Sequence, residues 1–270
     1  MPDELLLQED IGTTRILTLN RTEAENKLNH DLLMALEAAL AASDNDPGCR
    51  AVVLTAMGEV FCCGGELGDY RRQTADDIRR FGERFIAVHT GIARLNKPVI
   101  AAVQGDALGG GFSLVEACDL AVASERARFA VPEIKSGLAP MMALTGVRRV
   151  LTRKGCMELA LLGEMVSAAR AREIGLVNWV CAAEDVLPQA LTVAETLSSA
   201  NPTAVALCKQ LLRRGDALNY EAQIGMSLTG LVALLKSTDA SEALTAREAG
   251  RAPIWSVSDD GTRSRIANDA

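Results

Sequence analysis

Two short glycine-rich turns are the part of this sequence most suited to chemistry. Gly64 and Gly65 follow the apolar stretch AVVLTA at 51–56, and Gly109 to Gly111 follow VIAAVQG at 99–105. A helix-like stretch comes after each, so each turn connects a strand to a helix. Glycine lets the backbone approach a ligand and leaves its N–H group unobstructed. Two such turns can aim two N–H donors at one oxygen atom, which is an oxyanion hole.

Other glycine-rich motifs fit these turns less well. A dinucleotide-binding turn needs GxGxxG, which neither segment contains. A P-loop needs GK[ST] after its glycines, and this chain has Phe112 in place of that lysine. Taken separately, each cluster is also compatible with a tight turn and nothing more. Their recurrence after two consecutive strand-like stretches favours the oxyanion hole.

Ser113 and Glu133 are the polar residues best placed to act beside such turns. Ser113 lies two residues after the glycine triplet, and Glu133 follows Pro132 in the stretch FAVPEI. A serine nucleophile needs a base, but only His30 and His89 are available and GFSLV is not the GxSxG turn. A carboxylate in an apolar setting is costly to bury without a role, although an exposed or ion-paired loop acid is the alternative for Glu133.

Strands and helices that alternate along the chain must hold these residues. Hydrophobic patterning predicts strands at 15–20, 51–56, 99–105, 119–124 and 176–180, and helices at 31–43, 76–95 and 109–118. The first of these helices is expected to begin at Asp31 as its N-cap. Such alternation predicts an α/β fold with a mostly parallel sheet.

The chain is expected to divide into three segments. Residues 1–186 form the predicted core, and residues 187–255 carry only helical patterns, with Asn201 and Pro202 as one helix start. This helical subdomain is a candidate for contact with a neighbouring subunit. Residues 256–270 are polar and aperiodic, and we expect them to be disordered.

Composition narrows the class of function. A net charge of −7 argues against nucleic acid as a partner. The sequence contains no run of about 18 apolar residues, so we expect no membrane partner. Seven cysteines without paired spacing and an acidic start without a signal-peptide pattern predict reduced thiols in the cytoplasm. With two histidines and no CxxC, we expect no metal site.

Several segments together resemble the enoyl-CoA hydratase/isomerase (crotonase) superfamily. They are FCCGGELGD, VIAAVQGDALGGGFSLVEACDLAVAS, FAVPEIKSGLAP and, with Thr22 in place of a usual proline, LNRTEAENKLNHDLL. The likeness runs in order from about residue 5 to residue 255. It implies a crotonase-like spiral of ββα units and a helical C-terminal region used to form a trimer or a dimer of trimers. It also implies an acyl-CoA thioester as substrate, so coenzyme A arrives as part of the substrate and no separate cofactor is needed.

The resemblance also assigns roles at the site. It implies that the thioester oxygen lies between the N–H groups of Gly65 and Gly110, with Glu133 as general acid/base. Family hydratases carry a second glutamate where this chain has Ser113, a departure shared with some hydroxycinnamoyl-CoA hydratase-lyases. Ser113 is then either a hydroxyl that positions water or substrate, or a helix-capping or space-filling residue. Glu116, one turn further on, is a candidate for a displaced carboxylate, but we expect a solvated or ion-paired side chain.

Further residues are expected along the CoA and acyl parts of the substrate. The resemblance implies this for Arg21, Lys27, Cys63, Gly64, Glu66, Leu67, Gly109, Met141 and Met142. Among these, Glu66 is expected to brace its turn. The two methionines either shape the acyl end of the pocket or fill the core.

These features predict a lyase that adds water to, or removes it from, an α,β-unsaturated acyl-CoA. The alternatives within the superfamily are cleavage of a hydrated aromatic acyl-CoA to an aldehyde and acetyl-CoA, isomerisation, and decarboxylation. A different class also fits the missing glutamate: a protein that binds acyl-CoA without catalysis. A serine hydrolase is the third class; the missing GxSxG turn and the presence of only two histidines, His30 and His89, speak against it.

Overall fold

Six strands form the central sheet of the computed structural model, which describes residues 4–215 and 217–255. The strand order is β1-β2-β3-β5-β7-β10. Their bounds are β1 Leu6–Ile11, β2 Thr14–Leu19, β3 Ala51–Ala56, β5 Val99–Val103, β7 Leu120–Ser124 and β10 Trp179–Cys181. β1 runs antiparallel to β2, and all other neighbours are parallel. The predicted α/β fold with a mostly parallel sheet is confirmed.

A second sheet of short strands accompanies the first. Its order is β4-β6-β8-β9, with bounds β4 Val60–Cys62, β6 Asp106–Leu108, β8 Arg128–Ala130 and β9 Val166–Ser167. Along the chain, a long strand, a short strand and a helix follow one another three times: β3-β4-α2, β5-β6-α3 and β7-β8-α4. This is the spiral of ββα units that the resemblance implies.

Ten α-helices are present in the described ranges. They are α1 His30–Asn45, α2 Ala75–Arg94, α3 Gly110–Ala117, α4 Met141–Val150, α5 Arg153–Leu162, α6 Ala168–Glu173, α7 Val186–Ser199, α8 Pro202–Gly215, α9 Tyr220–Leu235 and α10 Thr238–Glu248. Short 3-10 helices lie at η1 Thr22–Ala24, η2 Tyr70–Arg72, η3 Pro132–Ser136 and η4 Ala183–Asp185. None of these helices is long and apolar enough to cross a membrane.

Two of the predicted helix starts can be checked against their capping contacts. The N-cap of α1 is Asn29, whose side chain accepts a hydrogen bond from the Leu32 N–H at 2.9 Å, so the expectation that Asp31 caps this helix is wrong. Asp31 instead lies inside the first turn, where a carboxylate favours the positive end of the helix dipole. The Asn201 side chain accepts from the Ala204 N–H at 3.0 Å, which confirms the predicted start of α8.

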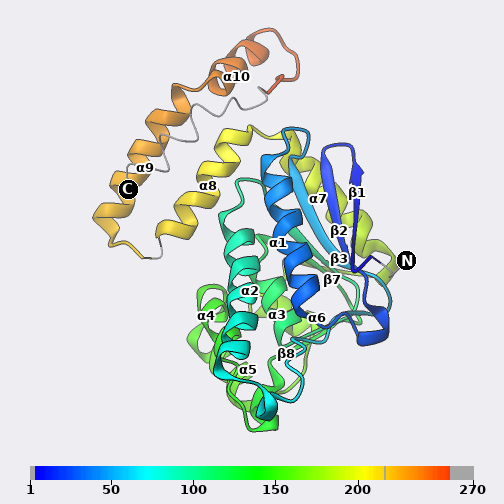
Figure 1. Cartoon of the computed structure of the whole chain (residues 1–270). Coiled ribbons are helices and arrows are strands. Elements are labelled where there is room, and N and C mark those ends of the chain that lie inside the picture. The colour runs from blue at the N-terminus through cyan, green and yellow to red at the C-terminus, as the bar shows by residue number, and fades with distance from the viewer. Residues whose placement is uncertain (1–3, 216, 256–270) are drawn as a thin grey trace.

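The central sheet is covered on both faces. Ala51 and Val53 of β3 pack with Ala190 and Ala194 of α7, whereas alternate residues of the same strand face α1, α2 and α3. β3 is therefore buried along its whole length, which suits its run of apolar residues. Helix α7 lies within the predicted helical subdomain but packs on the core sheet (Figure 1).

Helices α8 to α10 extend away from the sheets (Figure 1). Lys209 of α8 forms an ion pair with Asp119 and donates to the Lys97 carbonyl oxygen at 2.8 Å, which fastens α8 to the core. The three helices expose many large apolar side chains: Leu212, Tyr220, Ile224, Leu228, Leu231, Val232, Leu235 and Leu244. The division of the chain at residue 186 stays a prediction, and residues 256–270 lie outside the described part.

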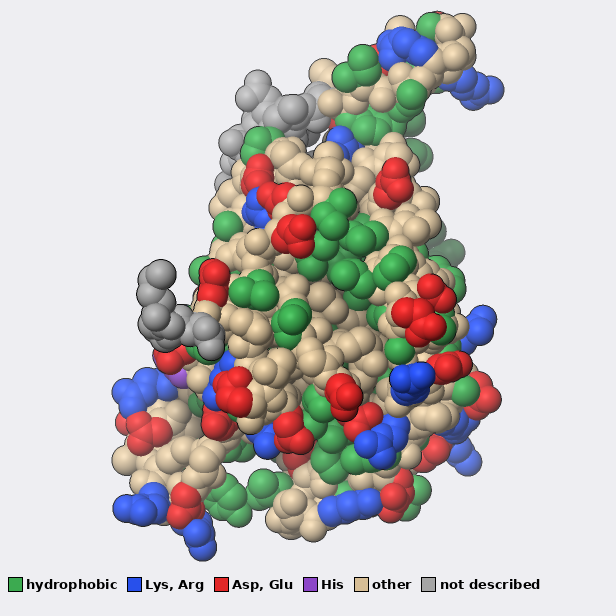
Figure 2. Space-filling model, turned by 90° about the vertical axis from the view of Figure 1, so that its right-hand side faces the viewer, with side chains coloured by type: hydrophobic (Ala, Val, Ile, Leu, Met, Phe, Trp, Pro, Cys, Tyr) green, Lys and Arg blue, Asp and Glu red, His purple; other side chains and the backbone are tan. Residues whose placement is uncertain are grey.

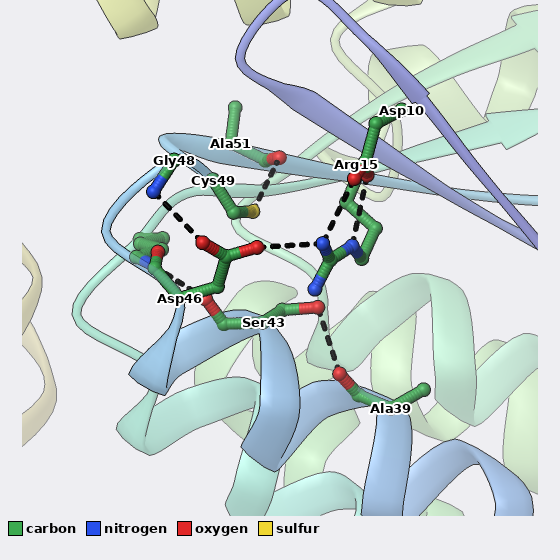
Figure 3. Close-up of polar contacts among 9 residues, drawn as sticks. Asp10, Arg15, Ala39, Ser43, Asp46, Gly48, Cys49 and Ala51 are labelled. Atoms are coloured by element: carbon green, nitrogen blue, oxygen red, sulfur yellow. Dashed lines mark hydrogen bonds and ion pairs between the residues drawn. The ribbon is translucent and has the colours of Figure 1, made fainter.

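Side chains on β1, β2 and the end of α1 are joined by an ion-pair cluster (Figure 3). Arg15 donates two hydrogen bonds of 2.9 Å to Asp10 and one of 2.7 Å to Asp46. Asp46 also accepts from the Gly48 N–H at 2.8 Å. The cluster ties the edge of the sheet to the loop that leads into β3.

The face that carries β1 and α7 is the one turned to the viewer in Figure 2, where hydrophobic side chains gather among acidic ones. A hollow of about 350 Å³ lies between β1, β2 and α7, lined in part by Leu7, Ile16, Met57 and Leu187. The glycine turns belong to the opposite side of the sheet, with α2 and α3.

Candidate active site

The two glycine turns lie against each other. They follow β4 and β6, which are parallel neighbours in the second sheet, so both turns leave that sheet at the same edge. Gly64 and Gly109 have φ of +99° and +51°, in the region that favours glycine. A Cβ built on Gly110 would lie 3.2 Å from the Gly65 nitrogen. The structure therefore brings together the two residues expected to supply the oxyanion hole.

The N–H groups of Gly65 and Gly110 are left without acceptors. Their neighbours are engaged: the Glu66 N–H donates to the Leu28 oxygen at 2.8 Å, and the Gly109 N–H to the Ala130 oxygen at 2.9 Å. Within residues 4–215 and 217–255, neither the Gly65 nor the Gly110 N–H donates a hydrogen bond. Gly110 is also the first residue of α3, where N–H groups have no partner inside the helix and carry the positive end of its dipole. Both N–H groups are thus available to an oxygen atom of a ligand.

The Glu133 carboxylate lies beside these turns. Glu133 is the second residue of η3, which Val131 separates from β8, and its Oε1 would be 3.1 Å from a Cβ built on Gly109. Its Oε2 is sealed from solvent and has no hydrogen-bond partner among the described residues. Burial raises the pKa of Glu133, while a backbone N–H group opposes the shift. A half-buried carboxyl group with a raised pKa and a partnerless oxygen can take up and return a proton.

Ser113 lies one turn along α3 and is only 1% exposed. Its Oγ donates to the Gly109 carbonyl oxygen at 3.3 Å, and its N–H donates to the same oxygen at 3.1 Å. In the described part of the chain, no base accepts a hydrogen bond from this hydroxyl. The hydroxyl is therefore held by the helix backbone, and a part in positioning water or substrate stays a prediction.

Glu116 differs from expectation. It is half-buried, and no ion pair or hydrogen bond joins it to another described residue, so the expected solvated or ion-paired side chain is wrong. Its carboxylate instead lies against Gly146 of α4, where a built Cβ would be 1.7 Å from Oε1. Burial raises the pKa of Glu116 to about 8, with nearby Arg149 opposing the shift. The absence of a side chain at Gly146 makes the room that this carboxylate occupies.

Comparison with known proteins identifies the family. The family model described as "Enoyl-CoA hydratase/isomerase" matches residues 12–256 of this chain. The chain belongs to the enoyl-CoA hydratase/isomerase family. It is 36% identical over 235 residues to a probable enoyl-CoA hydratase of Rhizobium meliloti, covering 84% of this chain and 91% of that one. It is also 31% identical to the short-chain-enoyl-CoA hydratase of Clostridium acetobutylicum, covering 89% and 93% of the two chains.

Solved structures show the same relationship. An enoyl-CoA hydratase of Mycobacterium smegmatis superposes with a TM-score of 0.89 at 35% identity, covering 94% of this chain and 99% of that one. An enoyl-CoA hydratase from Bacillus anthracis gives a TM-score of 0.90 at 28% identity, covering 94% and 100%. The mixed α/β architecture described above is therefore that of the crotonase fold.

Arg21, Lys27 and Glu66, which are expected to lie along the CoA part of the substrate, make contacts beside the Gly64–Gly65 turn. Arg21 donates to the Lys27 carbonyl oxygen at 2.6 Å and to the Glu66 carboxylate at 2.9 Å. Glu66 thereby holds its turn, as expected of a bracing residue. Lys27 is half exposed and pairs with Glu25 at 3.1 Å. These cations lie beside the turn, and their contact with CoA stays a prediction.

The remaining residues of the predicted site are spread around the turns. Leu67 is 36% exposed, and Met141 and Met142 at the start of α4 are 69% and 44% exposed. Core packing is therefore excluded for the two methionines within this chain. Cys63 is half-buried, and its N–H donates to the Glu25 oxygen at 3.0 Å. No group of three or more His, Cys, Asp or Glu side chains in the described ranges is placed to hold a metal ion.

Two phenylalanines near the turns were missed by sequence reasoning. A Cβ built on Gly65 would lie 3.1 Å from Phe81 Cζ, and one built on Gly110 would lie 3.2 Å from Phe85 Cε2. The signal in the sequence is the i, i+4 spacing of two aromatic residues in the helix that follows the first turn. Phe81 also lines a hollow of about 430 Å³ beside this turn, with Leu67, Gln73 and Arg80.

Proposed function

We propose that this protein is an enoyl-CoA hydratase-type lyase that adds water across the double bond of an α,β-unsaturated acyl-CoA, or removes it in reverse. The observation that carries the proposal is the Glu133 carboxyl group, with its partnerless Oε2, beside two unengaged N–H groups of Gly65 and Gly110. Relatives named enoyl-CoA hydratase support the same substrate class.

In this proposal the thioester oxygen accepts hydrogen bonds from the Gly65 and Gly110 N–H groups. Ionised Glu133 takes a proton from water while the water oxygen bonds to Cβ, and the Cα–Cβ π electrons move to the thioester as an enolate. The two N–H groups stabilise the enolate oxygen. Glu133, now protonated, gives its proton to Cα, which restores the carbonyl group and the carboxylate. One water is consumed, and one glutamate serves first as base and then as acid.

Hydration followed by cleavage is the second candidate, because the family resemblance implies that Ser113 stands in place of a second glutamate; its hydroxyl donates to the Gly109 carbonyl oxygen. With one carboxylate at the turns, a polar group of the substrate would assist the proton transfers. After water has added to Cβ, the Glu133 carboxylate would take the proton of the new hydroxyl group while the Cα–Cβ bond breaks, which gives an aldehyde and the enolate of acetyl-CoA. Return of that proton from Glu133 to Cα of the enolate would complete the cleavage.

The test is incubation with aliphatic, branched and aromatic enoyl-CoAs, followed by mass spectrometry of the products. A gain of one water supports hydration, and an aldehyde with acetyl-CoA supports cleavage. A shifted double bond would indicate isomerisation. Loss of CO2 from a carboxyacyl-CoA would indicate decarboxylation, and the absence of any product across the panel would indicate a protein that binds acyl-CoA without catalysis. Glu133→Gln should lower kcat by about 10²–10⁴, whereas Glu195→Gln, an exposed change on α7, should leave kcat unchanged. A Glu133→Gln enzyme with full activity would exclude the proposed role.

The proposed role of the Gly110 N–H as an oxyanion donor can be tested by comparing two variants, Gly110→Pro and Gly110→Ala. Proline has no N–H group and is tolerated at the first position of a helix, which is where Gly110 lies. Alanine keeps the N–H group and adds the same Cβ. Gly110→Pro should therefore lose about 10²–10³ in kcat beyond whatever Gly110→Ala loses. Equal losses in both variants would contradict the donor role.

We also propose that the protein forms a trimer or a dimer of trimers. The exposed apolar side chains of α8 to α10 support this, since exposed patches of this kind mark contact surfaces. Light scattering should give three or six times the 28.6 kDa of the chain. A cytoplasmic location is proposed because all seven cysteines are free, as expected in a reducing compartment.

A further inference from the structure

Three aromatic residues form a stripe along one face of α2. Phe81, Phe85 and His89 are spaced four residues apart, which places them on the same side of the helix. The stripe runs past both glycine turns. The stripe lies on the helix that follows the first turn, and it contacts residues of both turns, so it can fix the position of one turn relative to the other.

Each phenylalanine ring contacts one of the two oxyanion glycines. The ring atoms nearest to the built Cβ positions are 3.1 Å away for Phe81 at Gly65 and 3.2 Å away for Phe85 at Gly110. These distances are shorter than ordinary carbon–carbon contact, so each ring fills the space that a side chain would need. Rotation of either glycine peptide toward α2 would drive it into a ring. The rings therefore limit the directions in which the two N–H groups can point.

His89 holds the second ring in place. The His89 and Phe85 rings are stacked, with centroids 4.0 Å apart and planes inclined by 27°. His89 Nδ1 lies 2.8 Å from the Phe85 carbonyl oxygen, which requires the proton on Nδ1. Nε2 is sealed from solvent and has no partner in the part of the chain that is described. Burial lowers the pKa of His89, and the backbone of Phe85 and Ser113 opposes this shift.

We propose that Phe81, Phe85 and His89 are positioning residues that set the spacing and direction of the two oxyanion N–H donors. The inference rests on the proposed function and adds a requirement outside the glycine turns. Hydrogen bonds weaken steeply with distance and angle, and a lost oxyanion donor costs about 10²–10³ in rate. A loosened donor should cost part of that, about 10- to 100-fold in kcat.

The experiment compares Phe85→Leu, His89→Ala and His89→Phe with Val88→Ala as matched control. Val88 is fully buried on the same face of the helix, but its side chain is not among the nearest neighbours of Gly65 or Gly110. The first readout is kcat and KM with the best enoyl-CoA of the panel. The second is the carbonyl stretch of bound butyryl-CoA, labelled with ¹³C at the carbonyl, by difference infrared spectroscopy. Hydrogen bonds to the thioester oxygen lower this frequency, and the measurement needs no turnover.

Phe85→Leu and His89→Ala should lower kcat 10- to 100-fold with KM within about threefold, and should return the carbonyl band toward its frequency in water. His89→Phe keeps a ring against Phe85 and should retain both the band and most of kcat. Val88→Ala should lower the thermal midpoint but leave the band in place.

A Phe85→Leu protein with an unchanged band and kcat would overturn the inference. The same holds if Val88→Ala moves the band as far, or if wild-type protein does not lower the frequency at all. Failure of the proposed function would show differently. The wild type would then hydrate none of the enoyl-CoAs, while the butyryl-CoA band still distinguished Phe85→Leu from Val88→Ala.

Discussion

Replacing Glu116 by glutamine should stabilise the protein at alkaline pH. The carboxylate is half-buried between α3 and α4, against Gly146, and no hydrogen bond joins it to another described residue. Burial raises its pKa from 4.5 to about 8. Glutamine has nearly the same shape and carries no charge, so the substitution removes the cost of burying an ionised group.

The sign and size of the effect follow from proton linkage. The folded protein holds the Glu116 proton more tightly than the unfolded chain, so stability falls as pH rises from 4.5 toward about 8. At 1.36 kcal/mol per pH unit, that interval corresponds to about 5 kcal/mol when the group is fully shielded. Because Glu116 is only half-buried and Arg149 lies nearby, we expect a gain of about 1–3 kcal/mol for Glu116→Gln at pH 8.5.

The assay is denaturant unfolding at pH 5 and pH 8.5, at one fixed protein concentration because an oligomer unfolds with concentration dependence. The stability advantage of Glu116→Gln should be small at pH 5 and large at pH 8.5. Glu83→Gln, at an exposed position on α2, should follow the wild type at both pH values. Glu133, whose pKa is also raised, leaves part of the pH dependence in place. A Glu116→Gln protein less stable than wild type at pH 8.5, or an advantage equal at both pH values, would refute the reasoning.

Two further substitutions test contacts that position the core. Asn29→Ala removes the N-cap of α1 and should lower the free energy of unfolding by about 1 kcal/mol in denaturant titration; Asn29→Asp, which can still accept from the Leu32 N–H, is the control and should lose less. Arg15→Met removes the ion pairs to Asp10 and Asp46; Arg15 is the main cause of the lowered pKa of Asp10 and adds to the effect of the Gly48 N–H on Asp46, so the substitution should lower the thermal midpoint at pH 7. Because those pairs contribute only while the carboxylates are ionised, the difference should shrink as the pH falls below 3.8; a difference independent of pH would contradict this account.

The long strands could be predicted because they are buried, and burial favours the apolar residues of which they consist. β3 is buried on both faces and is apolar at every position except Thr55, and β2, β5 and β7 are nearly as clear. The last predicted strand, 176–180, forms a strand only from Trp179, because the Leu176 N–H still donates to the Ala171 carbonyl oxygen in the turn that ends α6. β1 was missed because four of its six residues are exposed.

The second sheet could not be predicted by patterning. β4, β6 and β8 have three residues each, which is too short for a period of two to show. They exist because they pair with one another, and those partners are more than 20 residues apart in the chain. Only the family resemblance indicated them. The two turns that carry the candidate site follow β4 and β6, so their meeting was likewise beyond local sequence patterns.

The glycines show most clearly what one residue type can and cannot indicate. Gly109 is required by a φ of +51°, whereas Gly111 is required because a Cβ would lie 2.1 Å from the Cys62 carbonyl oxygen. Gly146 has neither reason: it lies inside a helix and makes room for the Glu116 carboxylate. Glycine inside a helix costs about 1 kcal/mol of stability relative to alanine, and the helical backbone at position 146 gives no reason for that cost. A glycine with no local cause indicates a close neighbour from elsewhere in the chain. Here that neighbour is the Glu116 carboxylate, whose pKa burial raises to about 8.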